Sequence, residues 1–471
     1  MKGTKQISEN FSIVSNQLRW AFIVTSIAIA TGCAVALFLW LLDVVTNIRW
    51  ANPWLLFLLP FAGVLIAFVY TKFGGRSGKG NNLIIDEIHT PGGGVPRRMA
   101  PLVLLGTLVT HLFGGSAGRE GTAVQMGGSI AAMFGNWFGL HKQNMGLALM
   151  AGIAAGFGAV FGTPLTGAIF AMEVLAIGRL QYNALLPCLV AAIVGDASCA
   201  AWGTHHTKYH IASLTPSANS LAVFLHIDVW LLLKVIAGGI AFGLAGFLFA
   251  QMAHRFKYLF QKWIKVPLLI PIVGACIIIL LTYVLGTRDY LGLGVSANSP
   301  HAVTVVSAFG VGGAGSMSWF WKMLFTAITL SCGFKGGEVT PLFFMGAALG
   351  NTLAVLFGAP IDLFAGLGFI AVFAGATNTP LACTIMGVEL FGGEHVLYYA
   401  VACFSAYLCS GHSGIYSAQI IAVPKSTGAY FGDGISLANS FKRRNKFTEG
   451  ILLLWWRGLK AKKGGVGKKG G

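Results

Sequence analysis

The amino-acid sequence predicts an all-α, polytopic membrane protein whose helices are in many places short or interrupted. Of its 471 residues, 55% are hydrophobic and only 10% are charged, and the mean hydropathy is +0.74. This composition is typical of chains that cross a membrane repeatedly and excludes an ordinary soluble enzyme. Several apolar runs are shorter than the ~20 residues that a straight span needs. Because interrupted helices are tolerated only where protein surrounds them, we expect them to line an internal cavity.

The apolar runs begin near Leu18 and recur almost to Ile421. In chain order, they predict membrane segments near residues 20–47, 53–72, 100–117, 121–138, 144–161, 164–178, 184–202, 220–253, 266–286, 301–315, 317–333, 340–357, 361–378, 380–392 and 397–410. Trp40, Trp50 and Trp54 lie in or just after the first run, where aromatic residues anchor a span at the membrane interface. The 64 glycines fit close packing between helices.

Charge and hydropathy divide the chain into four regions. We expect a polar N-terminal segment at 1–19, transmembrane halves at 20–253 and 254–421, and a basic tail at 422–471, within which 452–456 is interfacial. The formal net charge is +17, concentrated in the tail. Basic runs also suit nucleic acid, but the positive-inside rule favours two cytoplasmic termini and no nucleic-acid partner. The prediction is a multi-pass protein of the cell (inner) membrane, surrounded by lipid.

Neither cysteines nor histidines predict a metal or cofactor site. The eight cysteines occur singly, without a CxxC pair, and we expect them to be reduced packing residues. The polar segment 204–218 contains His205, His206 and His210, but their spacing matches no metal-binding signature, and an exposed loop between spans is favoured. No cleavable signal peptide is evident, since the first apolar run is too long and lacks a processing site.

The most informative stretch is residues 114–122 (GGSAGREGT), which lies between the apolar runs 99–113 and 123–138. An acid inside such a run costs about 2.5–3.5 kcal/mol on insertion scales, so Glu120 is a candidate functional residue. The glycines predict a break between helices, and the free N–H groups at the next helix start would bind an anion. Glu120 could occupy this anion site or be displaced from it. The alternative is a glutamate that only caps its helix.

A second glycine-rich turn, residues 74–84 (GGRSGKGNNLI), also leads into a helix. It lacks the GxxxxGK[ST] spacing and a surrounding strand–helix unit, which excludes nucleotide binding. Asn81 or Asn82 is expected at the N-cap, where asparagine is among the preferred residues. An ordinary capped helix is the alternative interpretation.

The two halves of the chain repeat each other. Residues 163–173 and 379–389 both begin with TPL and continue, at equal spacing, with an isoleucine and a final glutamate. Upstream, the GxExT pattern of 118–122 recurs at 336–340. Two matches in the same order, at nearly the same distance along the chain, indicate a duplicated half.

The repeat predicts where a transport site lies. Transporters built from repeats place their site at the repeat interface, at the N-termini of broken helices. The helix starts at Asn81, Glu120 and Glu338 are therefore expected to direct backbone N–H groups at one anion. The Tyr416 hydroxyl is a further candidate donor, although alone it would suggest an interfacial tyrosine.

In these residues the chain resembles the CLC family of chloride channels and proton-coupled anion antiporters, over residues 20–420. The family motif GSGIP corresponds to 80–84 (GNNLI), GREGP to 118–122 (GREGT), GxFxP to 337–341 (GEVTP), and the pore tyrosine to Tyr416. The resemblance implies a homodimer of inverted-repeat subunits, each with many tilted and broken helices and its own pore.

The departures from these motifs are informative. The chloride-contacting serine of the family is replaced here by Asn81, and the proline of GREGP is replaced by Thr122. The phenylalanine of the third motif is replaced by Val339, which follows the acid Glu338. The internal proton-transfer glutamate of chloride antiporters corresponds to Val174. These substitutions resemble the CLC-F branch, whose members exchange fluoride for protons in bacterial membranes. An asparagine amide provides two donors where a serine hydroxyl provides one, which suits a small, strongly hydrated anion.

The resemblance implies a fluoride/proton antiporter with Glu120 as gate and proton carrier, and not an enzyme. The alternatives are a chloride/proton antiporter or passive anion channel of the same family, and a multispan metalloenzyme, which no HExxH spacing supports. Glu338 and Glu173 are possible members of the proton route. The expected anion-binding residues are Asn81, Asn82, Gly118, Arg119, Gly121, Glu338, Val339, Thr340 and Tyr416.

Overall fold

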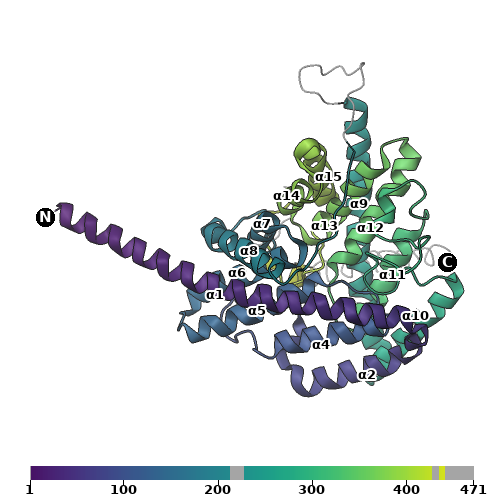
Figure 1. Cartoon of the computed structure of the whole chain (residues 1–471), viewed down its shortest axis with the longest axis horizontal. Coiled ribbons are helices and arrows are strands. Elements are labelled where there is room, and N and C mark those ends of the chain that lie inside the picture. Colours follow the sequence, from purple (N-terminus) through teal and green to yellow (C-terminus); the bar gives the residue numbers. More distant parts are fainter. Residues whose placement is uncertain (1, 213–227, 427–433, 441–471) are drawn as a thin grey trace, which may run out of the picture.

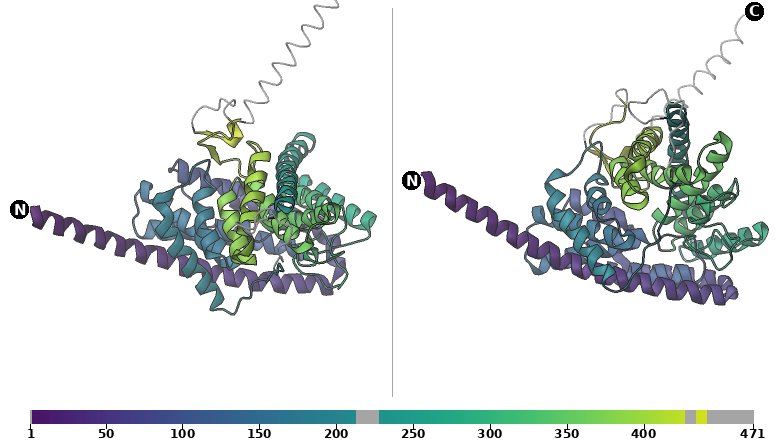
Figure 2. Two further views of the ribbon diagram at one scale, coloured as in Figure 1. Left: turned by 90° about the horizontal axis from the view of Figure 1, so that it is seen from above. Right: turned by 45° about the horizontal axis from the view of Figure 1, so that its top comes forward.

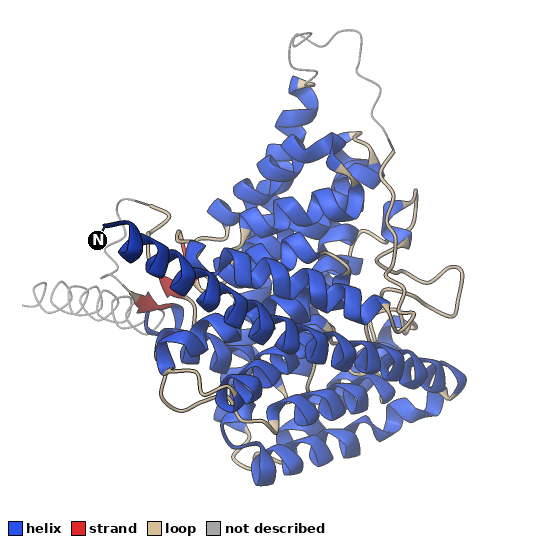
Figure 3. Ribbon diagram, turned by 60° about the vertical axis from the view of Figure 1, so that its left-hand side comes forward, coloured by secondary structure: helices blue, strands red, loops and turns tan. Residues whose placement is uncertain are grey.

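The computed structural model describes residues 2–212, 228–426 and 434–440. Helices dominate these ranges (Figure 3), in agreement with the predicted polytopic, mostly helical architecture. Within the described ranges, six helical segments are long and apolar enough to cross a membrane, namely Ser15–Ala51, Pro53–Lys79, Asn144–Phe161, Tyr182–Ala200, Val229–Trp263 and Val339–Phe357. The basic tail from 441 onward, with its expected interfacial segment 452–456, lies outside the described residues.

The chain begins with one long helix. α1 (Lys2–Ala51) runs along one side of the bundle, and its first turns project beyond it (Figures 1 and 2). It ends just before Asn52, because a residue that precedes proline disfavours helical conformation. Shorter pieces follow: η1 (Pro53–Leu58), α2 (Leu59–Val69), the π-helical turn η2 (Tyr70–Gly74), η3 (Gly75–Lys79) and α3 (Asn81–His89).

The chain continues with α4 (Met99–Leu112), α5 (Glu120–Trp137), α6 (Lys142–Phe161), α7 (Pro164–Glu173), η4 (Tyr182–Ala184) and α8 (Leu185–Ala200). After residues 213–227 follow α9 (Val229–Trp263), α10 (Leu269–Leu285), η5 (Ser307–Phe309), α11 (Ser318–Ser331), α12 (Val339–Phe357), α13 (Ile361–Thr377), α14 (Pro380–Phe391), η6 (Gly393–His395) and α15 (Val396–Cys409). The two TPL motifs begin α7 and α14 with Pro164 and Pro380, because proline at the first helical position needs no N–H partner.

Equivalent helix pairs in the two repeats cross closely at glycines. A Cβ on Gly127 of α5 would lie 2.0 Å from the carbonyl oxygen of Gly152 of α6, and a Cβ on Gly152 would lie 2.4 Å from that of Gly127. Gly346 of α12 and Gly368 of α13 stand in the same relation, at 2.0 Å in both directions. Any side chain at these positions would force the backbones apart, so the glycines permit the tight packing that membrane helices use.

A small sheet, which the all-α prediction does not contain, joins the end of α7 to the segments after α15. β1 (Ala176–Ile177) pairs in parallel with β2 (Ile420–Ile421), and β2 pairs antiparallel with β3 (Ile435–Ser436). The strands lie at one edge of the helical bundle (Figure 3).

Two boundaries differ from the sequence prediction. No long helix covers 301–315, where only the short η5 forms; four glycines at 310, 312, 313 and 315 favour turns over a helix. The division of the halves drawn at 253/254 lies inside α9. The division of the chain into two halves stays a prediction.

Candidate functional site

Two glycine turns, one from each repeat, meet in the centre of the molecule. The turn before α5 and the turn before α12 form an antiparallel bridge between Gly118 and Gly337. The Gly118 N–H donates to the Gly337 carbonyl at 2.6 Å, and the Gly337 N–H donates back at 2.8 Å. A Cβ on Gly337 would lie 2.6 Å from the backbone nitrogen of Gly121, so this approach requires glycine. The bridge holds the starts of α5 and α12 together.

The side chain of Glu120, the first residue of α5, reaches across this bridge and is only 1% exposed. Its Oε2 accepts hydrogen bonds from the Thr340 backbone N–H at 2.9 Å, from the Thr340 Oγ1 at 2.5 Å, and from the Arg119 N–H at 3.2 Å. Oε1 lies 3.5 Å from Arg119 Nε and has no hydrogen-bond partner among the described residues. The carboxylate therefore occupies the N-terminus of α12, where an anion is favoured.

Asn81 is brought to the same centre by α3. It is the first residue of the helix, and Gly80 is the N-cap, so the predicted asparagine N-cap is wrong. Gly80 has a φ of 60°, a conformation that glycine adopts without strain and asparagine with more difficulty. A Cβ on Gly121 would lie 3.2 Å from Asn81 Nδ2 and 3.6 Å from Glu338 Oε2. The amide and this carboxylate thus face one small space beside the start of α5.

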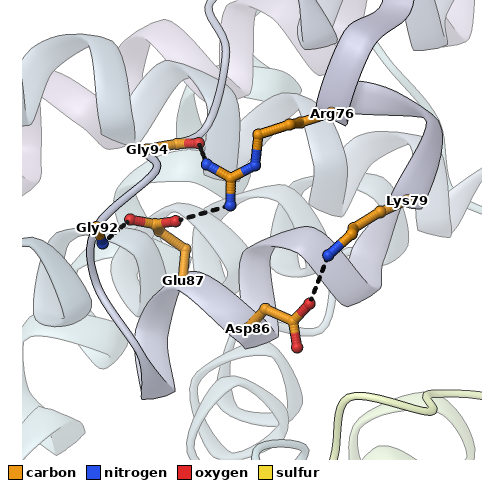
Figure 4. A network of polar contacts seen from close by, with 6 residues as sticks. All are labelled: Arg76, Lys79, Asp86, Glu87, Gly92 and Gly94. Carbon is orange, nitrogen blue, oxygen red and sulfur yellow. Dashed lines mark hydrogen bonds and ion pairs between the residues drawn. The ribbon is translucent and has the colours of Figure 1, made fainter. Parts of the chain in front are cut away.

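A polar network holds α3 in position. It consists of Arg76, Lys79, Asp86, Glu87, Gly92 and Gly94 (Figure 4). Arg76 Nη2 lies 3.4 Å from Glu87 Oε2, and Lys79 Nζ lies 3.3 Å from Asp86 Oδ2. Glu87 also accepts from the Gly92 N–H at 2.7 Å, while Arg76 donates to the Gly94 carbonyl at 3.2 Å. The loops on both sides of α3 are fastened to it, which fixes the direction of its N-terminus.

A cavity of about 540 Å³ opens onto Asn81, Glu338 and Tyr416. We call this cavity the vestibule. Its lining also contains Lys257 and Lys335, and it includes more basic side chains than acidic ones. The Lys335 ammonium lies over the ring of Tyr70, 4.1 Å from its centroid, where a cation–π contact is favourable. A concave surface with excess positive charge raises the local concentration of anions.

Two predicted anion ligands have other partners. Asn82 Oδ1 accepts a hydrogen bond from the Ala418 N–H at 2.9 Å, so this side chain ties α3 to the segment that carries Tyr416. Val339 is buried and is the first residue of α12. Its side chain is apolar, so only its backbone could donate a hydrogen bond. Arg119 lines a second, smaller cavity together with Glu120. Among the predicted residues, Asn81, Asn82, Glu338 and Tyr416 line the vestibule.

Glu173 caps a helix of the opposite repeat. Its Oε1 and Oε2 accept from the backbone N–H groups of Leu381 and Ala382, at 3.1 and 2.8 Å, at the start of α14. Glu389, at the end of α14, accepts in the same way from the start of α7, with 2.9 Å to the Leu165 N–H and 2.8 Å to the Thr166 N–H. In the structure, the final glutamate of each repeated motif therefore caps the helix that begins at the other motif. The spacing of the motifs alone did not indicate this contact.

Val174 lies next to Glu173 but faces a different space. A small cavity of about 10 Å³ is lined by Val174, Asn81, Tyr416 and apolar side chains including Val124 and Phe170. The side chain at 174 therefore shares an apolar surface with Asn81 and Tyr416. At this position the chain has no group that could carry a proton.

Sequence reasoning did not assign three residues near the centre to the site. Lys335 and Lys257 line the vestibule; Lys335 directly precedes the 336–340 motif, a proximity that would have indicated it. His206 lines the second cavity together with Glu120, and nothing in the local sequence of its loop indicates this.

No group of three or more His, Cys, Asp or Glu side chains that could hold a metal ion occurs in the ranges that the structure describes.

Comparison with known proteins places these features in context. The sequence model of the family described as voltage gated chloride channel matches residues 62–411. A chloride/fluoride channel protein of Pseudomonas syringae pv. tomato is 46% identical over 423 residues, which cover 88% of this chain and 90% of that protein.

Two solved structures are similar over most of the chain. The crystal structure of a CLC-type fluoride/proton antiporter superposes with a TM-score of 0.79 at 34% identity, covering 86% of this chain and 98% of that one. The structure of a slow cyanobacterial Cl⁻/H⁺ antiporter gives a TM-score of 0.68 at 21% identity, covering 83% and 94%, and shares the fold.

Proposed function

The chain belongs to the CLC family of voltage-gated chloride channels, and on this premise we propose that it exchanges fluoride for protons across a cell membrane. It is a multi-pass secondary transporter and not an enzyme. The observation that carries the proposal is the Glu120 carboxylate, which occupies the N-terminus of α12 and lines the second cavity. Similarity to a fluoride/proton antiporter over 86% of the chain supports the choice of ions.

Glu120 acts in this proposal as both gate and proton carrier. As a carboxylate it takes the donors of Thr340 and Arg119 and so blocks the position that an anion would occupy. Once protonated it loses its charge and no longer competes with an anion for these donors, because hydrogen bonds to a charged acceptor are roughly twice as strong as neutral ones. The side chain then leaves, an anion enters, and the departing side chain carries one proton.

The preference for fluoride rests in this proposal on the space between Asn81 and Glu338. Removing water from a small anion is costly and must be offset by short hydrogen bonds from fixed donors. The Asn81 amide, held on a helix fastened by the network around α3, supplies such donors at the end of the vestibule. Gly121 keeps this space open. A larger halide would need a wider opening there.

We assign the inner part of the proton route to Glu338. Its carboxylate lines the vestibule and lies close to Asn81 and Gly121, within the same centre as Glu120. Glu173, the other candidate, directs both oxygens at the start of α14. Its arrangement favours a structural role. Val174, where chloride antiporters have their internal acid, lines an apolar cavity.

Chloride/proton exchange is the second candidate function. It is favoured by the description of the Pseudomonas relative, which includes both chloride and fluoride. Side-by-side measurement of fluoride and chloride efflux from liposomes containing the purified protein separates the two. We expect faster fluoride efflux with proton uptake; equal rates would favour the chloride function, and efflux without proton movement would favour a passive channel.

We further propose that two copies assemble as a homodimer through α7, α8, α14 and α15. These helices carry exposed apolar side chains, among them Leu165, Leu186, Ile193, Phe404 and Leu408. A two-fold symmetric dimer is the commonest assembly of identical chains. Both termini are assigned to the cytoplasm on the positive-inside rule, which agrees with the basic residues of the vestibule face.

A further inference from the structure

The loop that follows α8 lies over the side of Glu120 that faces away from the vestibule. Residues 204–212 carry His206, Thr207 and Tyr209 into a cavity that they share with Arg119 and Glu120. His206 also packs on Gly162, whose hypothetical Cβ would lie 2.5 Å from the imidazole Cδ2. We call this space, the second cavity described above, the outer cavity. The loop is therefore part of the transport centre and not a freely exposed connection.

Three residues that line the outer cavity carry buried polar atoms with no hydrogen bond of good geometry among the described residues. They are Glu120 Oε1 and Arg119 Nε, which lie 3.5 Å apart, and the ring nitrogens of His206, of which Nε2 lies 3.8 Å from Asp196 Oδ1. Buried polar atoms in proteins are nearly always satisfied by protein or by ordered water. Unsatisfied atoms on three residues that line one space indicate that this space has a polar occupant.

The outer cavity has room for one water molecule. Its volume is about 20 Å³, and a space of roughly 10–15 Å³ is enough for one water that has two to four polar partners. We propose that a water in the outer cavity joins His206 to Glu120, and that this imidazole–water pair is the route by which protons pass between the outer solution and the gate. His206 is thus a positioning residue that acts through the water.

The groups around His206 suit a relay. Asp196 of α8, whose side chain is 27% exposed, lies with Oδ1 3.8 Å from His206 Nε2 and connects the ring to solvent. Arg119 faces the ring from the turn before α5, His205 from the same loop, and the Val160 carbonyl from α6. Burial, then the positive charge of Arg119 and the neighbouring His205 side chain, lower the pKa of His206 to about 4. The ring is therefore neutral at neutral pH, with one nitrogen protonated and the other free to accept.

Proton balance follows from this neutral ring. A proton from the solvent side binds the free nitrogen, the proton on the other nitrogen passes to the water, and the water gives one of its protons to Glu120 Oε1. The imidazole ends neutral as the other tautomer, and the water is unchanged. No net charge remains on His206, which suits its position beside Arg119.

This inference rests on the proposed function, and it is tested with His206→Gln, which keeps a polar side chain but does not exchange protons. His210→Gln is the matched control, because His210 is an exposed histidine of the same loop and is not among the groups that act on the His206 ring. Fluoride-driven proton transport into liposomes is measured from pH 5 to 8, with equal pH on both sides. We expect His206→Gln to shift the alkaline fall of the rate to lower pH by roughly one unit, a tenfold slower protonation of Glu120, and His210→Gln to match wild type.

A wild-type profile for His206→Gln, or a loss by the same factor at every pH, would overturn the relay, since the second result is that of a structural defect. A second measurement is independent of folding losses. In a Glu120→Gln background, fluoride flux should not change further with His206→Gln, because the gate can no longer accept a proton. If the wild type does not couple fluoride to protons at all, the proposed function fails; if it does and His206→Gln behaves as wild type, only the relay fails.

Discussion

The Glu120 carboxylate accepts hydrogen bonds from both the backbone and the hydroxyl of Thr340, a residue 220 positions away in the opposite repeat. The acid of one glycine turn thus occupies the helix start created by the equivalent turn of the other. The bridge between Gly118 and Gly337 holds this geometry in place. In the proposed mechanism, the carboxylate and an anion therefore compete for the donors of Thr340.

Glu120→Gln should uncouple protons from anions. The amide keeps the size of the side chain but does not take up or release a proton in this pH range. Because the amide is uncharged, fluoride can still compete for the donors of Thr340. We expect fluoride flux that no longer moves protons, measured with a pH electrode and a fluoride electrode on the same liposomes. Proton pumping by this variant against a gradient would show that another residue is the carrier.

Asn81→Ser should weaken the preference for fluoride and admit more chloride. If the amide donates to fluoride, the loss of this hydrogen bond to a charged group costs about 1.5–3 kcal/mol, or roughly one to two decades in relative affinity. The measurement is the ratio of initial fluoride to chloride efflux rates at one pH. An unchanged ratio in a selective protein would move the filter to Thr340, Glu338 or Tyr416.

Gly121→Ala should block transport while the protein still folds. The added methyl group would lie 2.9 Å from Gly337 Cα and 3.2 Å from Asn81 Nδ2, and it would fill the space assigned to the anion. Gly92→Ala is the control, because a Cβ there meets nothing within 4 Å. Flux and gel-filtration profile are compared for both. Wild-type transport by Gly121→Ala would place the anion elsewhere.

Glu173→Gln and Glu389→Gln should have matching effects. Each removes one charged cap from the start of the partner helix, at a cost of about 0.5–2 kcal/mol of stability. We expect both to lower the unfolding temperature in detergent while the ratio of protons to fluoride stays that of wild type. A changed ratio for Glu173→Gln alone would assign this residue to the proton route.

How much the sequence predicts depends on how local each feature is. The starts of α5, α7 and α14 follow from glycine turns and proline positions, and their boundaries agree with the structure within a few residues. The roles of Asn82 and Glu173 do not follow, because their partners at 418 and 381–382 are distant in the chain. For the same reason His206 was assigned to an exposed loop: only the folded chain brings it to Glu120.

The central claim, that Glu120 couples fluoride to protons, is tested most directly by uphill proton transport. Liposomes containing the purified protein are given a fluoride gradient with equal pH on both sides, and the pH outside is followed. The account predicts that fluoride leaving the liposomes draws protons inward and raises the outside pH, that an equal chloride gradient does so more weakly, and that Glu120→Gln abolishes the change. Fluoride efflux from wild-type liposomes without any proton movement would contradict it.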